Sequence, residues 1–342
     1  MSNYERQKRI TLVDVAQRAG VSYQTVSRVV NDHPSVSRET RQRVARAIKE
    51  LDYRPNRAAQ SLVTRRSFML ELITFGSELY GPAHMIASVG QTARGLGYNL
   101  TVNNMEGSSP DDYRQALDSI SDHLVDGIVI LAPTDGTPVD ALLALCRGIP
   151  TVLVDSQLGV MSPSVVIDQR AGGRLIGEYL LGLGHRAIAE ITGPLHWHGA
   201  QARHDGVCQA LEVAGLTPVA SREGDWSPDC GYEITRTLLA EGVAFTALVA
   251  GNDHVALGAM RALRDHGQRV PEDVSVVGFD NLPESAYYEP PLTTVHQDFA
   301  ALGKQCIGYL AALIADPDLP VHQRVLYPRF VERQSTCPPR TG

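Results

Sequence analysis

The sequence predicts a small all-α domain joined to a larger α/β domain that contains two doubly wound parallel sheets. Three observations support this fold class. The chain has 342 residues, which is too long for one compact core. Its N-terminal region contains helix-type patterns with caps and a turn, and strand-like and helix-like runs alternate through the rest. Hydrophobic residues make up 43% and charged residues 20%, the composition of an ordinary globular protein.

The charge is distributed unevenly along the chain. Residues 1–66 carry 14 Lys and Arg against 6 Asp and Glu, whereas the remaining residues carry 17 against 32. The formal net charge of -7 therefore combines a basic N-terminal module with an acidic body. A basic module indicates an anionic partner such as nucleic acid, and we expect the acidic body not to bind nucleic acid.

Cysteine spacing and hydropathy argue against several classes of protein. The five Cys residues are widely separated and form no CxxC pair, which disfavours a zinc site or a disulfide framework and favours a reducing compartment. The charged N-terminus has no apolar segment of the signal-peptide kind, and no stretch is apolar and long enough to span a bilayer. We therefore expect a cytoplasmic protein that is not associated with a membrane.

The N-terminal region has the pattern of a helix-turn-helix. Thr11 and Asp14 form a capping box before an apolar-periodic run, and Gly20 ends that first helix. Ser22 caps a second short helix with an apolar stripe, and Ser37 caps a third. Two short helices joined by a glycine-containing turn have the spacing of a helix-turn-helix.

The second helix is the one expected in the major groove of DNA. Gln pairs with adenine and Arg with guanine, so we expect base reading by three side chains: Tyr23, Gln24 and Arg28. Short polar side chains suit phosphate oxygens, and this helix region carries four: Ser22, Thr25, Ser27 and Asn31. The alternative is a polar surface helix without a partner, which the agreement of cap, turn, stripe and local charge disfavours.

Residues 55–66 form a second distinctive segment. Pro55 ends the third helix, and Asn56 can cap a short Ala-rich helix that includes Ala59 and has Leu62 near its end. Such a short helix is marginal in water on its own, but it could fold when paired across a dimer on DNA. Leu62 would then wedge into the minor groove. These residues leave a plain interdomain linker equally open.

The rest of the chain alternates strand-like and helix-like runs. The strand-like runs include 70–75, 99–102, 127–132, 151–155, 188–192, 247–250 and 274–279. The helix-like runs include 83–96, 111–124, 173–183, 204–214, 231–240 and 254–266. This alternation predicts parallel, doubly wound sheets, and ligands in that architecture bind at the carboxyl ends of strands, in the crevice between lobes.

Polar side chains follow several of these strands. Asp155, Asn252 and Asp280 each come soon after a strand, and Arg203 lies beyond a strand and its loop. Carboxylates, an amide and a guanidinium in one cleft would bind sugar hydroxyls, while Trp226 would stack on the apolar face of a pyranose ring. The alternative for each Asp or Asn is that it caps the next helix, and the residues alone leave both explanations open.

Several stretches resemble the lactose repressor and galactose repressor family of transcriptional regulators. The N-terminal region contains TLVDVAQRAGVSYQTVSRVVND and VSRETRQRVARAIKELDYRPNRAAQSL, which resemble the family's headpiece and hinge helix. The body contains REGDWS, ALGAMRA, SVVGFDN and PPLTT in the same order, so the resemblance extends to about residue 334. It implies a dimeric, sugar-responsive repressor with a periplasmic-binding-protein-like body, whose hinge helix folds on a palindromic operator similar to the lactose operator. It also implies a bacterial-type protein that is associated with the nucleoid.

The resemblance also implies a domain organisation. The headpiece is expected at 1–54, the hinge helix and linker at 55–66, the effector-binding and dimerisation domain at 67–338, and a tail at 339–342. Within that domain the N-lobe would comprise about 67–167 and 298–326, and the C-lobe about 168–297 and 327–338. An effector that changes the angle between the lobes would separate paired hinge helices and release the DNA.

The effector site is implied by the same resemblance. Positions expected to contact the hydroxyls of a galactoside are Asp155, Arg203, Asn252 and Asp280. Positions expected to line the pocket are Trp226, Phe299, Leu79, Gly81, Pro82 and Gln297. The lactose-responsive branch has polar residues or Ile where this chain has Phe75, Leu131, Trp197, Gly199 and Met85. We therefore expect a pocket with a more apolar and aromatic wall, which leaves the identity of the sugar open.

Other interpretations are weaker. A sugar-binding transport protein of the same two-lobed fold would need export, which the headpiece disfavours. An enzyme lacks support because no GxSxG, P-loop, GxGxxG after a strand or HExxH motif occurs, and we expect no cofactor. His196 and His198 lie in a loop without a clear third ligand, so a pocket rim is favoured over a metal site.

Two further expectations concern the switch and the assembly. A different sugar or a corepressor, as in the purine-responsive branch of the family, is the alternative to a galactoside inducer. After Arg333 the sequence contains no Leu heptad of the kind that forms a coiled coil. We therefore expect a homodimer and not a tetramer.

Overall fold

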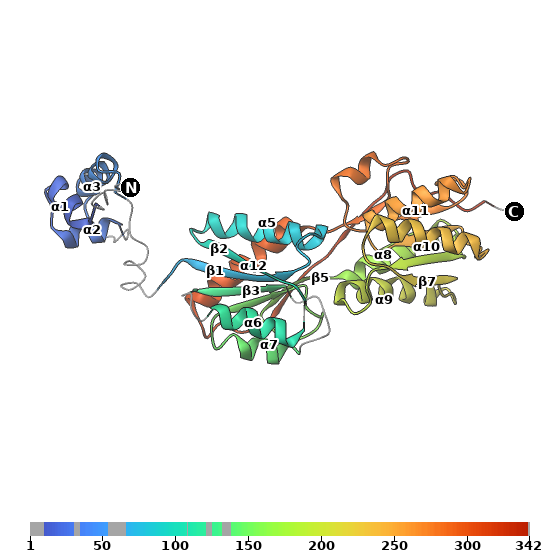
Figure 1. The fold of residues 1–342 in the computed structure, drawn as a ribbon, viewed down its shortest axis with the longest axis horizontal. Helices are drawn as coiled ribbons and strands as arrows, with labels where there is room; N and C mark the ends of the chain where they lie inside the picture. Colours follow the sequence, from blue (N-terminus) through green and yellow to red (C-terminus); the bar gives the residue numbers. More distant parts are fainter. Residues whose placement is uncertain are drawn as a thin grey trace, which may run out of the picture. The chain divides into compact units, whose positions relative to one another are not determined.

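The computed structural model describes residues 10–30, 35–53, 66–107, 109–120, 125–131 and 138–340. The chain divides into two compact units, Met1–Ser67 and Phe68–Gly342 (Figure 1). Four residues with predicted contacts to DNA lie outside the described residues: Asn31, Asn56, Ala59 and Leu62.

Within its described residues, the first unit contains three helices: α1 (Leu12–Ala19), α2 (Tyr23–Val30) and α3 (Arg38–Glu50). The predicted capping box is present, because the backbone N of Thr11 donates to Oδ2 of Asp14 at 2.7 Å and the backbone N of Asp14 donates to Oγ1 of Thr11 at 3.4 Å. Gly20 ends α1 at φ 63°, a left-handed conformation that glycine adopts without steric cost. The core contains Val15, Ala16, Val26, Val44, Ala47 and Tyr53.

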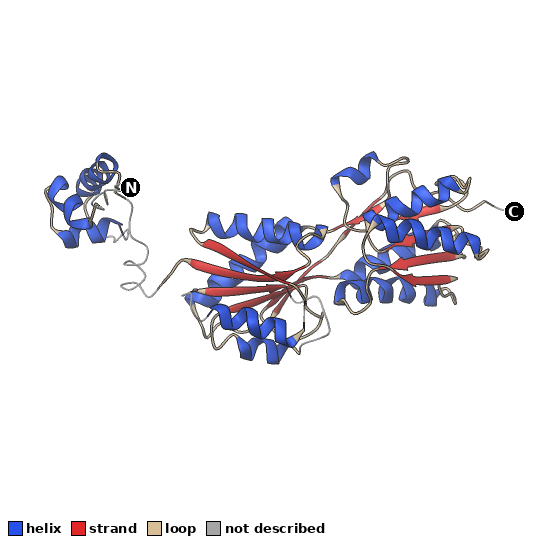
Figure 2. Ribbon diagram, viewed as in Figure 1, coloured by secondary structure: helices blue, strands red, loops and turns tan. Residues whose placement is uncertain are grey.

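A six-stranded parallel sheet forms one lobe of the second unit (Figure 2). Its strand order is β11-β5-β4-β3-β1-β2. Its strands are β1 (Met69–Phe75), β2 (Asn99–Met105), β3 (Gly127–Leu131), β4 (Thr151–Val154), β5 (Ser164–Ile167) and β11 (Gln323–Leu326). One face packs on α5 (Tyr80–Gly95) and α12 (Phe299–Ala315). The other face packs on α6 (Pro110–Ile120) and α7 (Val139–Leu145).

A four-stranded parallel sheet forms the other lobe, with the order β7-β6-β8-β9. Its strands are β6 (Ile188–Thr192), β7 (Ala220–Glu223), β8 (Ala247–Ala250) and β9 (Ser275–Val277). Helices α8 (Gln169–Gly182) and α9 (His198–Val213) pack on one face, and α10 (Pro228–Ala240) and α11 (Asp253–Asp265) pack on the other. A 3-10 helix, η1 (Pro283–Tyr287), and an antiparallel pair, β10 (Thr294–His296) and β12 (Arg329–Val331), complete the lobe.

The two parallel sheets confirm the fold class predicted for this region. Four predicted helix starts were too late. Helix α8 begins at Gln169 and not at 173, and α9 begins at His198 and not at 204. Helix α5 begins at Tyr80 and not at 83, and α10 begins at Pro228 and not at 231. For α8 the signal lies one residue earlier, where the side chain of Asp168 accepts from the backbone N of Ala171 at 2.8 Å and so caps the helix. Across the described ranges, no helix is long and apolar enough to cross a membrane.

Helices α8 and α9 approach each other closely at two glycines. A Cβ placed on Gly173 would lie 2.0 Å from the carbonyl oxygen of Arg203, and a Cβ on Gly206 would lie 2.1 Å from that of Arg170. No side chain fits at either position, so the two backbones are in direct contact there. This contact fixes the backbone of Arg203 against α8.

Substitution of Gly173 by Ala should therefore destabilise the second unit. Overpacking would force the two helices apart and lower the free energy of unfolding by about 1–3 kcal/mol, measured by urea unfolding with tryptophan fluorescence. Gly182→Ala at the end of the same helix is the matched control, because a Cβ there meets nothing within 4 Å. It should change stability by less than about 1 kcal/mol. Equal stability of the two variants would contradict the close packing.

Candidate functional site

Helix α2 presents the predicted DNA-reading side chains on the surface of the first unit. The three side chains expected to read bases, Tyr23, Gln24 and Arg28, are all exposed, and the exposed fraction of Tyr23 is 53%. Val26 on the same helix is fully buried in the core. Helix α2 therefore has one buried and one exposed face, as expected for a helix that packs on one side. Oγ of Ser22 accepts from the backbone N of Thr25 at 3.1 Å, which shows that Ser22 caps α2. Ser27 is half-buried.

The second unit contains a cavity of about 310 Å³, which we call the effector cavity. Its volume lies within the range of about 300–1,000 Å³ typical of small-molecule sites. The predicted effector residues in its lining are Leu79, Gly81, Pro82, Met85, Asp155, Trp197, Gly199, Arg203, Trp226, Asn252, Asp280, Gln297 and Phe299. They come from both lobes, so the cavity brings together most of the residues singled out in the sequence.

Phe75 and Leu131 lie outside this lining. Leu131 is 3% exposed and packs in the core between the six-stranded sheet and helices α5 and α12, because its side chain points to that face at the end of β3. The ring of Phe75 packs edge-on against Trp197, with ring centroids 5.1 Å apart. Phe75 therefore supports the wall from behind, and Leu131 extends the core.

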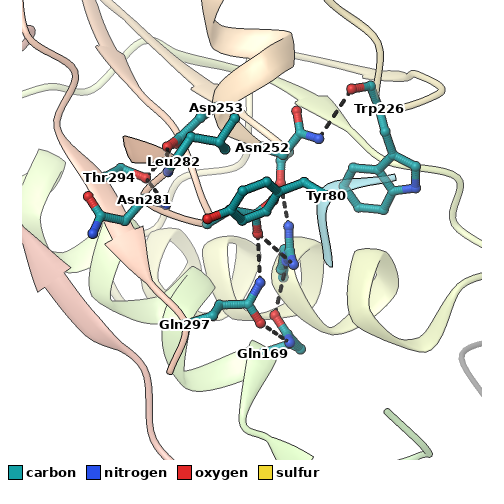
Figure 3. Close-up of polar contacts among 12 residues, drawn as sticks. Tyr80, Gln169, Trp226, Asn252, Asp253, Asn281, Leu282, Thr294 and Gln297 are labelled. Atoms are coloured by element: carbon teal, nitrogen blue, oxygen red, sulfur yellow. Dashed lines mark hydrogen bonds and ion pairs between the residues drawn. The ribbon is translucent and has the colours of Figure 1, made fainter. Parts of the chain in front are cut away.

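Arg203 is the centre of the polar network in the cavity. Its Nε donates to Oε1 of Gln169 at 3.0 Å, and its Nη1 donates to the carbonyl oxygen of Gly251 at 2.6 Å. Its Nη2 reaches Oδ1 of Asp280 at 3.4 Å. Gln297 closes the network by donating to Oδ1 of Asp280 at 2.6 Å and accepting from Nε2 of Gln169 at 2.7 Å (Figure 3). Every part of the guanidinium is thus held by the protein.

Aromatic rings flank the guanidinium of Arg203. Its central carbon lies 3.8 Å from the ring centroid of Phe279 and 5.3 Å from that of Trp226. A cation over an aromatic face is attracted by the quadrupole of the ring. Burial lowers the pKa of Arg203, while the charges of Asp280 and Asp155 oppose this effect.

Burial shifts the pKa of the acidic groups around Arg203 upward. It raises the pKa of Asp155 to about 6, an effect that Arg203 opposes and Asp280 reinforces. It also raises the pKa of Asp280, against the opposing charge of Arg203. Desolvation disfavours the charged form of a carboxyl, so these two groups lie in an environment where hydrogen bonds are stronger than in water.

Asp253 has a structural role outside the cavity lining. Burial raises its pKa to about 7. One carboxylate oxygen accepts from Oγ1 of Thr294 at 2.5 Å, and the other accepts from the backbone N of Leu282 at 2.8 Å (Figure 3). These bonds tie the start of α11 to β10 and to the loop before η1.

The helix-cap explanation applies to only one of the polar residues that follow strands. Oδ1 of Asn252 accepts from the backbone N of Val255 at 2.8 Å, so Asn252 caps α11, and its Nδ2 donates to the carbonyl oxygen of Trp226 at 3.2 Å (Figure 3). Asp155 and Asp280 cap none of the described helices, and their φ angles are 57° and 104°. Strained backbone of this kind concentrates at binding and catalytic sites.

Both tryptophans of the sequence line the effector cavity. The rings of Trp197 and Trp226 have centroids 6.1 Å apart and an interplanar angle of 66°. Nε1 of Trp226 is buried without a hydrogen-bond partner among the described residues. The position of its ring depends on Gly193, where a Cβ would lie 2.1 Å from it. Flat aromatic walls suit the apolar face of a sugar ring.

The sequence did not reveal every lining residue. Additional lining residues are Glu78, Tyr80, Ile167, Gln169, Ala200, Ser227, Pro228, His254 and Leu302. Gln169 is the most consequential of them because it contacts Arg203, and its one local signal is its place directly after the helix cap Asp168. Of the two histidines that raised the question of a metal site, His196 is exposed and His198 is half-buried. No metal-binding cluster of three or more His, Cys, Asp or Glu residues occurs in the described part of the chain.

Family models match both units of the chain. The model described as bacterial regulatory proteins, lacI family, matches residues 11–56, and the periplasmic binding protein-like domain matches residues 178–336. The lactose operon repressor of Escherichia coli (strain K12) is 38% identical over 334 residues, which cover 98% of this chain and 92% of that protein. The HTH-type transcriptional repressor PurR of Erwinia tasmaniensis is 35% identical over 333 residues, covering 96% and 97%.

Solved structures agree with these matches. The lac repressor dimer bound to operator and the anti-inducer ONPF has a TM-score of 0.88 and 38% identity, covering 96% of this chain and all of that chain. The complex of the transcriptional regulator CelR with cellobiose has a TM-score of 0.71 and 32% identity, covering 96% of this chain. The resemblance predicted from the sequence is thus confirmed, and the chain belongs to the lacI family of bacterial regulatory proteins as a DNA-binding transcriptional repressor.

Proposed function

We propose that the protein binds a palindromic, lactose-operator-like site as a homodimer and is released from it by a galactoside-like sugar. One observation carries the effector half of this proposal: two carboxylates, a guanidinium and an amide converge in a single cavity that both tryptophans line. The residues are Asp155, Asp280, Arg203, Asn252, Trp197 and Trp226. Such a cavity offers both acceptors and donors to sugar hydroxyls and flat faces to the ring.

The DNA half of the proposal rests on α2. Tyr23, Gln24 and Arg28 would read base edges, and Ser22 and its neighbours would contact phosphates. The exposure of the three base-reading side chains supports this assignment, as does the similarity to a lac repressor dimer bound to operator. Asn31 and the hinge residues Asn56, Ala59 and Leu62 are proposed for the phosphate and minor-groove contacts on the same grounds of similarity.

A sugar in the effector cavity would contact both lobes. Asp155 follows β4 of the six-stranded sheet, whereas Arg203 and Asp280 belong to the lobe of the four-stranded sheet. Hydrogen bonds from one ring to both groups depend on the angle between the lobes. The sugar therefore favours one arrangement of the lobes by its differential affinity, and we propose that this arrangement binds the operator less tightly.

A second effector chemistry has support of its own. PurR repressors are among the relatives at about a third identity, and the aromatic Trp197 forms part of the wall. A different sugar, or a corepressor that strengthens operator binding, is therefore the alternative to a galactoside inducer. A corepressor would raise the affinity for DNA, whereas a galactoside inducer would lower it.

The central test is a titration of a fluorescently labelled, lactose-operator-like palindrome with the full-length protein at fixed salt, followed by fluorescence anisotropy. Salt is held constant because phosphate contacts make affinity for DNA steeply salt-dependent. We expect tight binding that weakens when methyl β-D-galactopyranoside is added. Tighter binding after addition would favour a corepressor, and no binding to the palindrome would contradict the proposed operator.

Asp280→Asn is the control for the effector half of this experiment. The amide keeps the shape of the carboxylate but removes its charge, so the variant should bind the operator like the wild type and fail to respond to the galactoside. A variant that is released normally would show that Asp280 does not bind the effector. Loss of folding, seen by circular dichroism, would assign Asp280 a structural role with Arg203.

Arg28→Ala should relax sequence discrimination at one base pair of each half-site. A bidentate Arg–guanine pair contributes about 1–3 kcal/mol of discrimination against the wrong base, equivalent to about 5- to 150-fold in relative affinity. Anisotropy titrations against operators with single base-pair changes would measure this effect. Uniform weakening across all operators would indicate a phosphate contact instead, and unchanged discrimination would remove Arg28 from base reading.

Acidification should weaken binding of the galactoside. Because burial raises the pKa of Asp155 to about 6, this carboxylate loses its charge between pH 7.5 and 5.5 and becomes a weaker acceptor. Hydrogen bonds to charged groups contribute about 1 kcal/mol more than those between neutral groups, so affinity should fall roughly 5-fold, measured by tryptophan fluorescence. Protonation of Asp155 favours the folded state in this range, so unfolding is not the cause.

Asp155→Asn separates this group from the other acidic side chains near the cavity. The variant should bind the galactoside weakly at both pH values, without the step. A step of the same size in Asp155→Asn would assign the pH dependence to another carboxyl with a raised pKa, Asp280 or Asp253.

A further inference from the structure

An aromatic contact joins the two lobes of the second unit at the edge of the effector cavity. Phe75 ends β1 of the six-stranded sheet, whereas Trp197 directly precedes α9 in the lobe of the four-stranded sheet. Their ring centroids lie 5.1 Å apart at an interplanar angle of 63°, which is the edge-to-face geometry that aromatic rings prefer. The contact therefore depends on the angle between the two lobes.

The ring of Trp197 is held within its own lobe. Trp226 lies edge-on to it, with ring centroids 6.1 Å apart, and a Cβ on Gly193 would lie 2.1 Å from the Trp226 ring. The backbone N of Trp197 donates to the carbonyl oxygen of Pro194 at 2.9 Å, and its carbonyl oxygen accepts from the backbone N of Gln201 at 3.0 Å. A change in the lobe angle would therefore carry Trp197 away from the opposite lobe.

Phe75 is fixed in the other lobe in the same way. Strand β1 lies between β2 and β3, and Phe75 pairs with Met105 in the register of the sheet. The Phe75 side chain also packs against the core between the sheet and helices α6 and α7. The main chain continues close to the indole, since a Cβ on Gly76 would lie 3.6 Å from Cη2 of Trp197. Each ring of the pair thus moves with its own lobe.

The arrangement that contains this contact needs no sugar to satisfy its central buried charge. The guanidinium of Arg203 is bonded to Gln169, to the carbonyl oxygen of Gly251 and to Asp280. A sugar whose hydroxyls bond to Arg203 or Asp280 must replace some of these hydrogen bonds. The protein groups therefore favour this arrangement among themselves, and under the proposed function the arrangement that is populated before sugar binds is the one that binds the operator.

We propose that the Phe75–Trp197 contact is a latch between the lobes, which holds the operator-binding arrangement and which the sugar must break. The latch raises the concentration of sugar that is needed to release the operator. This inference rests on the proposed function, in which a sugar changes the angle between the lobes. It adds the two residues that oppose this change.

Phe75→Leu removes one ring of the latch. Leu keeps an apolar side chain against the core of the six-stranded sheet, so the variant should fold. Loss of an edge-to-face ring pair shifts an equilibrium by about 3- to 10-fold, and the sugar-binding arrangement should become more populated by this factor before sugar binds. Methyl β-D-galactopyranoside should therefore bind about 3- to 10-fold more tightly, measured by tryptophan fluorescence of the full-length protein.

Operator binding gives a second readout. At saturating galactoside, the operator affinity of Phe75→Leu should fall about 3- to 10-fold below that of the wild type, because fewer molecules return to the operator-binding arrangement. Without sugar it should fall by less, since that arrangement already predominates. A change confined to the cavity wall would alter sugar affinity and leave the operator affinity of the sugar-saturated protein unchanged. Fluorescence anisotropy of the labelled palindrome at fixed salt measures both operator affinities.

Phe330→Leu is the matched control. Phe330 is half-buried like Phe75, and its ring centroid lies 4.4 Å from that of Tyr179, but both rings of this pair belong to the lobe of the four-stranded sheet. A contact present in both arrangements shifts neither, so the sugar affinity and both operator affinities should stay within about 2-fold of the wild type. Urea unfolding followed by circular dichroism compares the stability of the two variants.

The outcomes separate this inference from the proposed function. If the galactoside releases the wild type and Phe75→Leu has the same affinities, the latch is overturned and the proposed function stands. Weaker sugar binding or tighter operator binding in Phe75→Leu would also overturn it, as would equal effects in Phe330→Leu. If the galactoside does not release the wild type from the palindrome, the proposed function fails and the latch fails with it.

Discussion

A buried guanidinium is tolerated in a protein only where acceptors and opposite charges surround it. The geometry of the effector cavity follows from the groups that surround Arg203 in this way. Its hydrogen bonds reach Gln169, the carbonyl oxygen of Gly251 and Asp280, which come from three separate segments of the chain. The glycine contact between α8 and α9 brings the backbone of Arg203 close enough for these bonds. The hydrogen-bond network of the site therefore depends on the packing of α8 against α9, because a shift of α9 would break it.

The parts of this arrangement that have local signals could be predicted from the sequence. A capping box and a glycine in the left-handed region define α1, and a carboxylate after an apolar run marks the ends of β4 and β9. The role of Gln169 could not be predicted, because its partner Gln297 lies 128 residues away in the sequence. No spacing within a segment encodes such a contact. The start of α9 also lacked a local signal in the sequence. The residue before this helix, Trp197, makes no side-chain cap hydrogen bond.

The direction of a side chain at the end of a strand also could not be predicted from the sequence. Phe75 and Leu131 both end strands of the same sheet, and successive strand residues point to opposite faces. Resemblance places both positions near the pocket, but only the packing decides whether an apolar replacement enters it. Leu131 joins the core beneath α5 and α12, whereas Phe75 reaches Trp197. Replacing a polar residue by an apolar one thus has a different structural effect at each position, although both residues belong to the same sheet.

The distribution of hydrogen bonds indicates which residue carries the signal of the proposed effector. Arg203 and Asp280 are already bonded to each other and to Gln297 or Gln169 within the protein. Asp155 is half-buried beside them, yet it accepts no hydrogen bond from the residues that the structure describes, and desolvation raises its pKa. A sugar hydroxyl gains most where it replaces reduced solvation, so we propose that its strongest new hydrogen bond is to Asp155. Since Asp155 belongs to one lobe and Arg203 to the other, this bond depends on the angle between them, which is the requirement for a ligand to shift a two-state equilibrium.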